Sequence, residues 1–238
     1  MANCIRCRNR RRGVRRERGV TLTELAIVFA IVGITVAVAA PNTIRWQRDQ
    51  RVKGAAHDVA DLLLLARSEA ARTSNRHVVI YGPPGTQDPA GTAITGSNGT
   101  VPFLVLNDGP AATANCQIDA GEARSVIEPA RDVRWGVTFA TARAPGDLGA
   151  ANFAPPQASG GTTATPANNP VPWFMFRADG VPVRFEGALA DCGAIGTTAL
   201  GGAAFYLTNG TRDYAVVLSP MGGVRVHVWS PTAGAWKS

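Results

Sequence analysis

RGVTLTE at residues 18–24, followed by sixteen uncharged residues at 25–40, is the stretch that decides the fold of this chain. From Val20 to the residue before Pro41, a helix would span about 30 Å, the thickness of a bilayer core. Residues 1–19 hold eight arginines and one acid, Glu17, so this segment alone carries the net charge of +7. We therefore predict one membrane crossing with a cytoplasmic N-terminal end.

The rest of the chain is electrically balanced, with sixteen basic and sixteen acidic residues among the other 219. This balance argues against a broadly basic, nucleic-acid-binding body. A content of 45% hydrophobic and 17% charged residues is too apolar for a disordered chain, and four cysteines are too few for a disulfide scaffold. We expect a packed core.

Three interpretations of the apolar stretch compete. A secretory signal would be cut near the small residues Ala37-Val38-Ala39 and removed. A plain anchor would keep the whole segment. In the third interpretation the cut falls between Gly19 and Val20, and the apolar helix becomes the new N-terminus.

The carboxylate of Glu24 favours the third interpretation. A charged side chain within a membrane helix costs about 2.5–3.5 kcal/mol on insertion scales. A cut after Gly19 would create a cationic amine on Val20, and a neighbouring subunit could bring its own amine to Glu24 and so fix the register between subunits. The alternative is that Glu24 reaches the headgroups from the end of the helix.

The same residues, Arg18 to Glu24 with the apolar run after them, closely resemble the prepilin leader of type IV pilins and type II secretion pseudopilins. The resemblance implies that a prepilin peptidase cuts after Gly19 and that the amine of Val20 is methylated. It also implies a single-pass protein of the bacterial inner membrane, with a periplasmic C-terminal domain. The apolar helix would then bind other pilin or pseudopilin subunits.

Residues 42–75 continue the helix in amphipathic form, to an end predicted near Ser74-Asn75. Pro41 should kink or locally unwind it. Residues 62–65 form an apolar patch around the whole helix, which suggests that its C-terminal part is buried in the globular domain while the earlier part contacts lipid or other subunits. The cations at 45, 48, 51 and 53 should form a collar that contacts headgroups or filament neighbours, with a nucleic-acid site as the alternative. The predicted buried stripe is Val52, Ala55, Ala56, Val59, Leu62, Leu63, Ala66 and Ala70.

Residues 76–238 are predicted to form a β-rich domain, which makes the fold class α+β, with one long helix packed on antiparallel sheet. Asp179-Gly180 and Asn209-Gly210 are typical of hairpin turns. Segments 83–100 and 141–172 are expected to be mobile surface insertions, with partner contact as the alternative. The predicted strands are 77–81, 103–106, 124–127, 133–139, 173–177, 181–185, 204–208, 214–218 and 224–229.

The long helix and the C-terminal half resemble the GspH/FimT family of minor pilins and pseudopilins, through residues 50–56, 65–70, 176–180 and 215–226. Some members bind DNA through a G-R-x-R element, and the corresponding Gly222-Gly223-Val224-Arg225 keeps the second arginine. Arg225 could form a modest patch with Arg212 and Lys237. The balanced charge argues against DNA as a partner.

Cys116 and Cys192 are the pair left after the leader, which holds Cys4 and Cys7, is removed, and an oxidising compartment would favour a disulfide between them. The three histidines lack the spacing of a metal site. No catalytic motif is present, so we expect neither enzymatic activity nor a cofactor. The resulting hypothesis is a minor pilin-like subunit of a type IV pilus; the alternatives are a type II secretion pseudopilin of the H kind and a DNA-binding minor pilin for natural transformation.

Overall fold

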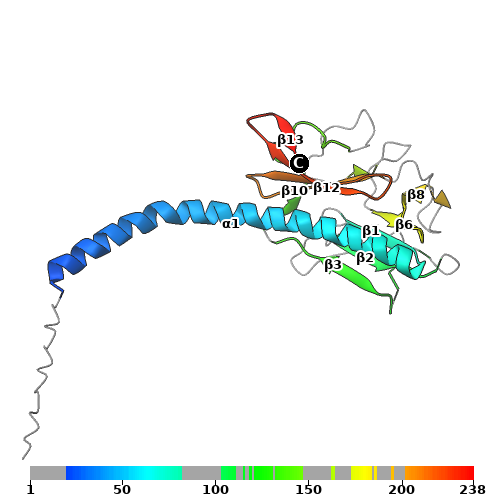
Figure 1. Cartoon of the computed structure of the whole chain (residues 1–238), viewed down its shortest axis with the longest axis horizontal. Helices are drawn as coiled ribbons and strands as arrows, with labels where there is room; N and C mark the ends of the chain where they lie inside the picture. Colours follow the sequence, from blue (N-terminus) through cyan, green and yellow to red (C-terminus); the bar gives the residue numbers. More distant parts are fainter. Residues whose placement is uncertain are drawn as a thin grey trace, which may run out of the picture. The chain divides into compact units, whose positions relative to one another are not determined.

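The computed structural model describes residues 20–81, 103–110, 115, 118–119, 121–130, 132–146, 162–163, 173–183, 185–186, 194–195 and 202–238. The chain divides into two compact units, Met1–Ile44 and Arg45–Ser238. One long N-terminal helix and a C-terminal domain of antiparallel sheets confirm the predicted α+β class (Figure 1).

Helix α1 extends from Leu22 to Thr73, as predicted. Its C-terminal end lies at Ser74, whose φ of 56° is in the left-handed region that terminates helices. The Thr73 hydroxyl donates a hydrogen bond to the Glu69 carbonyl (2.7 Å) and satisfies one of the last backbone acceptors.

Pro41 lies within α1, and the helix continues through it. Local unwinding, one of the two outcomes expected at this proline, is therefore wrong. Proline removes one backbone donor from the helix, but the other hydrogen bonds of the surrounding turns are retained. The Thr43 hydroxyl adds a bond to the Ala39 carbonyl at 3.0 Å.

The apolar stripe of α1 in the second unit is confirmed, because all eight of its predicted residues are buried. The C-terminal part of the helix is buried in the domain as expected, but the patch 62–65 is not covered all round. Leu62 and Leu63 are buried, but Leu64 and Leu65 are 46% and 48% exposed. Each residue turns about 100° around the helix axis, so four consecutive side chains cannot all face one domain.

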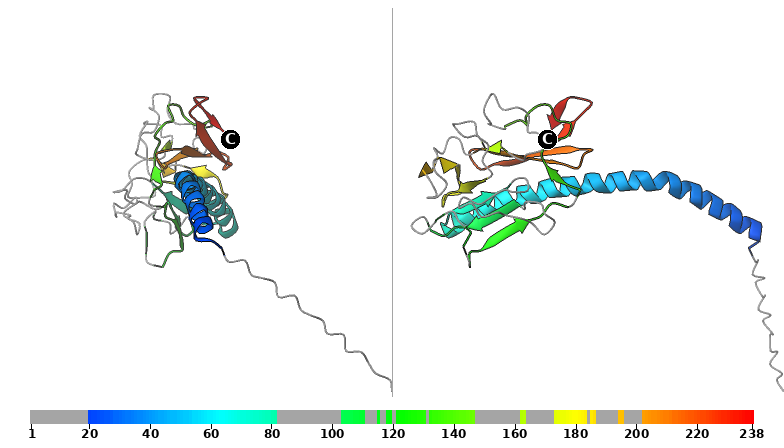
Figure 2. Two further views of the ribbon diagram at one scale, coloured as in Figure 1. Left: turned by 90° about the vertical axis from the view of Figure 1, so that its left-hand side faces the viewer. Right: turned by 180° about the vertical axis from the view of Figure 1, so that it is seen from behind.

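Two antiparallel sheets make up most of the second unit (Figure 2). The first has the strand order β3-β2-β1-β6-β7, and the second has the order β13-β12-β11-β10-β4, with β5 paired to β10; β8 pairs with β9. The strands are β1 His77–Ile80, β2 Phe103–Asn107, β3 Arg124–Ile127, β4 Arg134–Trp135, β5 Thr162–Thr163, β6 Trp173–Phe176, β7 Pro182–Val183, β8 Phe185–Glu186, β9 Ala194–Ile195, β10 Ala203–Thr208, β11 Asp213–Leu218, β12 Val224–Ser230 and β13 Ala235–Lys237.

The core of this unit joins the buried stripe of α1 to one face of each sheet. Aromatic rings fill its centre. Tyr81, which follows β1, and Phe103 of β2 both contact Phe205 of β10 edge to face. Their ring centroids lie 4.6 Å and 5.2 Å, respectively, from the centroid of Phe205. Such pairs are favoured by their quadrupoles beyond the area they bury. The sheets are therefore held by one continuous apolar cluster that includes the helix.

Both predicted hairpin turns are present, since Asp179-Gly180 joins β6 to β7 and Asn209-Gly210 joins β10 to β11. Gly180 has a φ of 74°, and a Cβ there would lie 3.2 Å from the Arg67 carbonyl oxygen. A Cβ at Gly222, between β11 and β12, would lie 2.7 Å from Arg67 Nε, while Arg67 Nη1 donates to the Gly222 carbonyl at 3.0 Å. One helix residue thus contacts two hairpin turns.

Three strand or loop expectations need correction. The strand expected at 133–139 is limited to β4, because Gly136 has a φ of 109° and the following amides bind a carboxylate instead of a neighbouring strand. The strand expected at 181–185 is divided between β7 and β8. A further strand, β13, was not expected, and it forms a hairpin with β12.

The segment 141–172 is not wholly a mobile insertion. The amide of Ala144 donates to the Tyr206 hydroxyl at 3.1 Å, and Trp236 Nε1 donates to the Ala142 carbonyl at 2.7 Å. Ala144 is buried against the outer face of the second sheet, and β5 pairs with β10. The remainder of this segment and all of 83–100 lie outside the described residues.

Candidate processing and assembly site

The first unit presents an apolar helix surface on which none of the described residues packs. Large apolar side chains between Leu22 and Val36 are exposed, from 49% for Val32 to 83% for Leu22. The window is long and apolar enough to cross a membrane, and none of it is buried within the structure. In a soluble core helix these side chains would be covered, so the surface requires lipid or neighbouring helices.

Thr21 and Glu24 form a reciprocal cap at the start of this helix. Glu24 Oε2 accepts hydrogen bonds from the Thr21 amide and from the Thr21 hydroxyl, both at 2.9 Å. The Glu24 amide donates in return to Thr21 Oγ1 at 3.3 Å. This is the capping-box arrangement, in which the threonine and the glutamate each satisfy a free backbone donor of the other.

The cap holds the Glu24 carboxylate at the N-terminal end of the helix, one turn from Val20. Val20 is 74% exposed, and Gly19 lies outside the described residues. Cleavage between these two residues would place a cationic amine immediately before the cap. The N-terminal end of the helix therefore combines the exposed residue Val20, the carboxylate of Glu24 and the start of the apolar surface.

Residues 14–40 match the family model of the prokaryotic N-terminal methylation motif. The motif indicates a precursor of the type IV pilin or pseudopilin type, and the apolar N-terminal helix is consistent with a membrane-anchored protein. It implies processing by prepilin peptidase and assembly with other pilins. No curated protein and no solved structure matches the chain.

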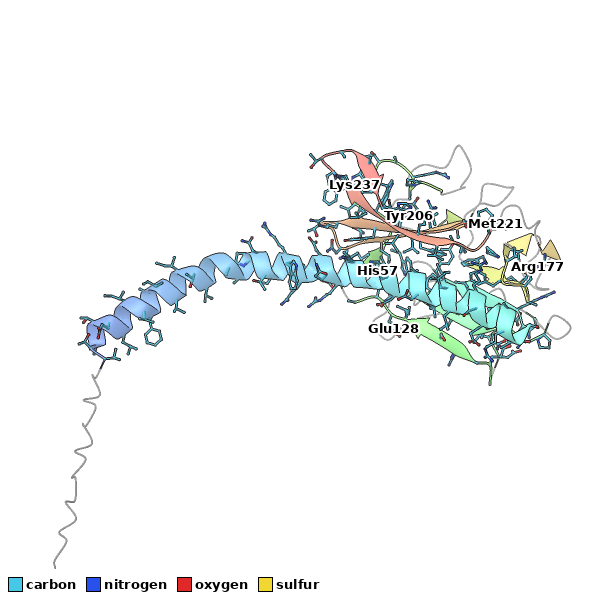
Figure 3. All side chains as sticks on the ribbon, in the orientation of Figure 1. His57, Glu128, Arg177, Tyr206, Met221 and Lys237 are labelled. Atoms are coloured by element: carbon cyan, nitrogen blue, oxygen red, sulfur yellow. The ribbon has the colours of Figure 1, made fainter. Side chains whose placement is uncertain are left out.

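The methylation motif does not bear on the three cations considered for DNA binding, and the structure places them apart. Arg225 lies opposite Val217 on the outer face of the second sheet, whereas Lys237 lies opposite Val228, whose side chain packs on the main core. Cross-strand partners share a face, so Arg225 and Lys237 point to opposite faces. Figure 3 shows Lys237 at the end of the unit away from Met221.

Arg212, the third of these cations, is occupied by an ion pair in the β10–β11 turn. Its Nε donates to Asp49 Oδ2 of α1 at 2.8 Å. The same carboxylate accepts from the Thr211 hydroxyl at 2.9 Å and from Asn209 Nδ2 at 3.3 Å. Asp49 therefore joins the helix to the Asn209-Gly210 turn, which sequence reasoning missed because no local pattern pairs positions so far apart.

Burial opposes the charged form of Asp49, but the hydrogen bonds from Thr211, Asn209 and Arg212 outweigh it and lower the pKa of this carboxyl. A lowered folded-state pKa contributes stability above the unfolded value of about 4, and that contribution is lost as the pH falls through the folded value. The interaction between Asp49 and the β10–β11 turn should therefore stabilise the domain more at neutral pH than at acid pH.

Asp49→Asn should destabilise the second unit by about 1 kcal/mol at neutral pH, a modest figure because Arg212 is half exposed and screened by solvent. The difference from the unchanged protein should shrink as the pH falls from about 4 through the lowered pKa of the folded carboxyl, below which the wild-type carboxyl is itself protonated. Chemical unfolding of both proteins at neutral pH and at acid pH measures the difference in their free energies of unfolding. Asp58→Asn, which changes an exposed carboxylate on the same helix, is the control. A difference that persists unchanged in acid would contradict the assignment.

The other candidate residues are dispersed or lie outside the described residues. Cys116 and Cys192 belong to the latter group, as do Cys4 and Cys7. His57 is exposed on α1, while His77 and His227 are buried on β1 and β12. Burial lowers the pKa of His227, and the nearby Arg225 lowers it further, so this ring favours the neutral form. Among the described residues, no group of three or more potential metal ligands is found.

Proposed function

We propose that this protein is a minor pilin-like structural subunit of a type IV pilus, without enzymatic activity, that is cut between Gly19 and Val20 and methylated on Val20. The observation that carries the proposal is the capped helix end, where Glu24 stands at the start of an exposed apolar helix. Before assembly this helix crosses the inner membrane, with residues 1–19 in the cytoplasm and the sheet domain in the periplasm.

Assembly then exchanges lipid for the helices of neighbouring subunits. Glu24 selects the axial register, because a neighbour that places its Val20 amine against the carboxylate removes two unpaired charges from an apolar bundle. The capping bonds occupy Glu24 Oε2. The second carboxylate oxygen, Oε1, can accept from the amine while the cap stays intact.

N-terminal mass analysis of the protein purified from cells tests the cut. We expect the mature chain to begin at Val20 and to carry one added methyl group. A chain that begins near Ala40 would support a secretory signal, and one that retains residues 1–19 would support a plain anchor. Either result would overturn the proposed processing.

The role in a pilus is tested separately, by deleting the gene. We expect pili to be lost or reduced while type II secretion continues. Loss of secretion with intact pili would assign the subunit to a secretion pseudopilus instead.

A further inference from the structure

The second unit begins with a cluster of cations that have no counterion among the described residues. Arg45, Arg48 and Lys53 are exposed on α1, and no described carboxylate forms an ion pair with them. Asp49 is the single acid between residues 41 and 57. We call Arg45, Arg48 and Lys53 the helix collar.

Two carboxylates near the collar, one on α1 and one that reaches Arg51 of α1, are already paired with other arginines. Asp49 binds Arg212 at 2.8 Å, and Asp132 binds Arg51 at 3.2 Å. Neither pair leaves a free negative charge for the collar. The collar is thus a local positive surface on a chain whose charges after residue 19, the collar included, sum to zero.

An exposed aromatic ring lies within the same helical turn. Trp46 is 61% exposed, and Ile44 before it is 51% exposed. A large exposed indole beside cations is the combination found where membrane helices pass through the headgroup layer, because the ring prefers the boundary and the cations prefer phosphate. Solvation by water alone does not explain an exposed indole at this position.

The collar lies at the distance from the apolar stretch at which a membrane helix passes through the lipid headgroup layer. Arg48 is the seventh residue after Pro41, which corresponds to about 10 Å of helix, and arginine side chains reach back several ångströms toward the headgroups. The cations also lie on the side that we expect to be exported, where the usual charge bias disfavours them. Their presence there requires a compensating interaction.

We propose that the helix collar and Trp46 bind the phosphate headgroups of anionic phospholipids at the periplasmic surface, and so hold the stored subunit at a set depth before assembly. This inference rests on the proposed membrane topology. The occupant is a lipid and not a protein, because the collar joins an aromatic ring to cations that begin about one turn beyond the membrane span.

Spin-labelled lipids test the proposal with the full-length protein in phosphatidylcholine vesicles. Electron spin resonance resolves the lipids slowed by contact with the protein and yields their selectivity for labelled phosphatidylglycerol over labelled phosphatidylcholine. A cation near an anionic lipid surface is worth about 1 kcal/mol, or about fivefold in affinity. We expect Arg45→Gln combined with Arg48→Gln to lower the selectivity at least about threefold at low salt, and about 1 M salt to abolish the difference.

Arg124→Gln combined with Arg225→Gln is the matched control, since it removes two exposed arginines from strands of the same unit. The control should keep the wild-type selectivity. Any contribution of residues 1–19 to lipid binding is the same in all the proteins compared, because all of them carry this segment. Equal selectivity in the collar variant and the control would overturn the lipid proposal while leaving the topology intact. Absence of any slowed lipid would overturn the topology as well. If the collar variant keeps its selectivity but fails to enter filaments, the cations contact a neighbouring subunit and the lipid proposal is wrong.

Discussion

Glu24→Gln should lower incorporation of the subunit into filaments by at least about 100-fold. The substitution leaves the neighbour's Val20 amine unpaired in an apolar bundle, and breaking a buried ion pair in this way costs about 3–5 kcal/mol. Glutamine keeps a carbonyl oxygen that can accept the hydrogen bonds of the Thr21 cap. The loss would therefore report the missing charge and not a frayed helix end.

Thr21→Val is the matched variant, because it removes the hydroxyl of the cap and keeps the carboxylate of Glu24. We expect it to enter filaments within a few-fold of the wild type. The measurement is the amount of subunit in sheared filaments relative to membrane-stored subunit, with mass analysis to verify that each variant is cut after Gly19. Equal loss in both variants would show that Glu24 acts by capping, and wild-type incorporation of Glu24→Gln would exclude the pairing.

Asp213→Ala should destabilise the sheet domain by about 3–5 kcal/mol, a loss typical of breaking a buried polar network. The carboxylate is fully buried and accepts from three consecutive backbone amides, Thr138 (3.0 Å), Phe139 (2.6 Å) and Ala140 (2.7 Å). Alanine would leave these donors without an acceptor. For a unit of this size the melting temperature should fall by about 10 °C.

Asp58→Ala is the control for this substitution, since it removes an exposed carboxylate from α1 and should change the stability by less than about 0.5 kcal/mol. Thermal unfolding of the full-length protein in detergent gives both values. Faster amide exchange at 138–140 in Asp213→Ala would locate the effect. An unchanged melting temperature would mean that the three amides find another acceptor.

Sequence reasoning recovered the features that depend on local pattern. The charge-free stretch before Pro41, the buried stripe from Val52 to Ala70 and the Asp-Gly and Asn-Gly turns each follow from residues close together in the chain. The start of α1 and its end at Ser74 follow for the same reason, since capping depends on a few neighbouring side chains.

The missed features depend on contacts between residues far apart in sequence. Asp213 looked like an ordinary start of a strand, yet it holds a segment more than 70 residues earlier, which is why the strand expected at 133–139 stops after Trp135. Asp49 and Arg212 pair across an even wider gap of 163 positions. The exposure of Leu64 and Leu65 also depended on which side of α1 the sheets occupy, and a local apolar run does not contain that information.

The contact between Arg67 and two hairpin turns bears on the order in which the domain can mature. Arg67 binds Gly222 across 155 positions of the chain, so this part of the helix cannot reach its final packing until nearly the whole polypeptide has been synthesised. Contacts of such long range slow folding because much of the chain must be brought together first. A truncated product that ends before the β11–β12 turn would therefore keep its helix uncovered and remain a target for proteolysis.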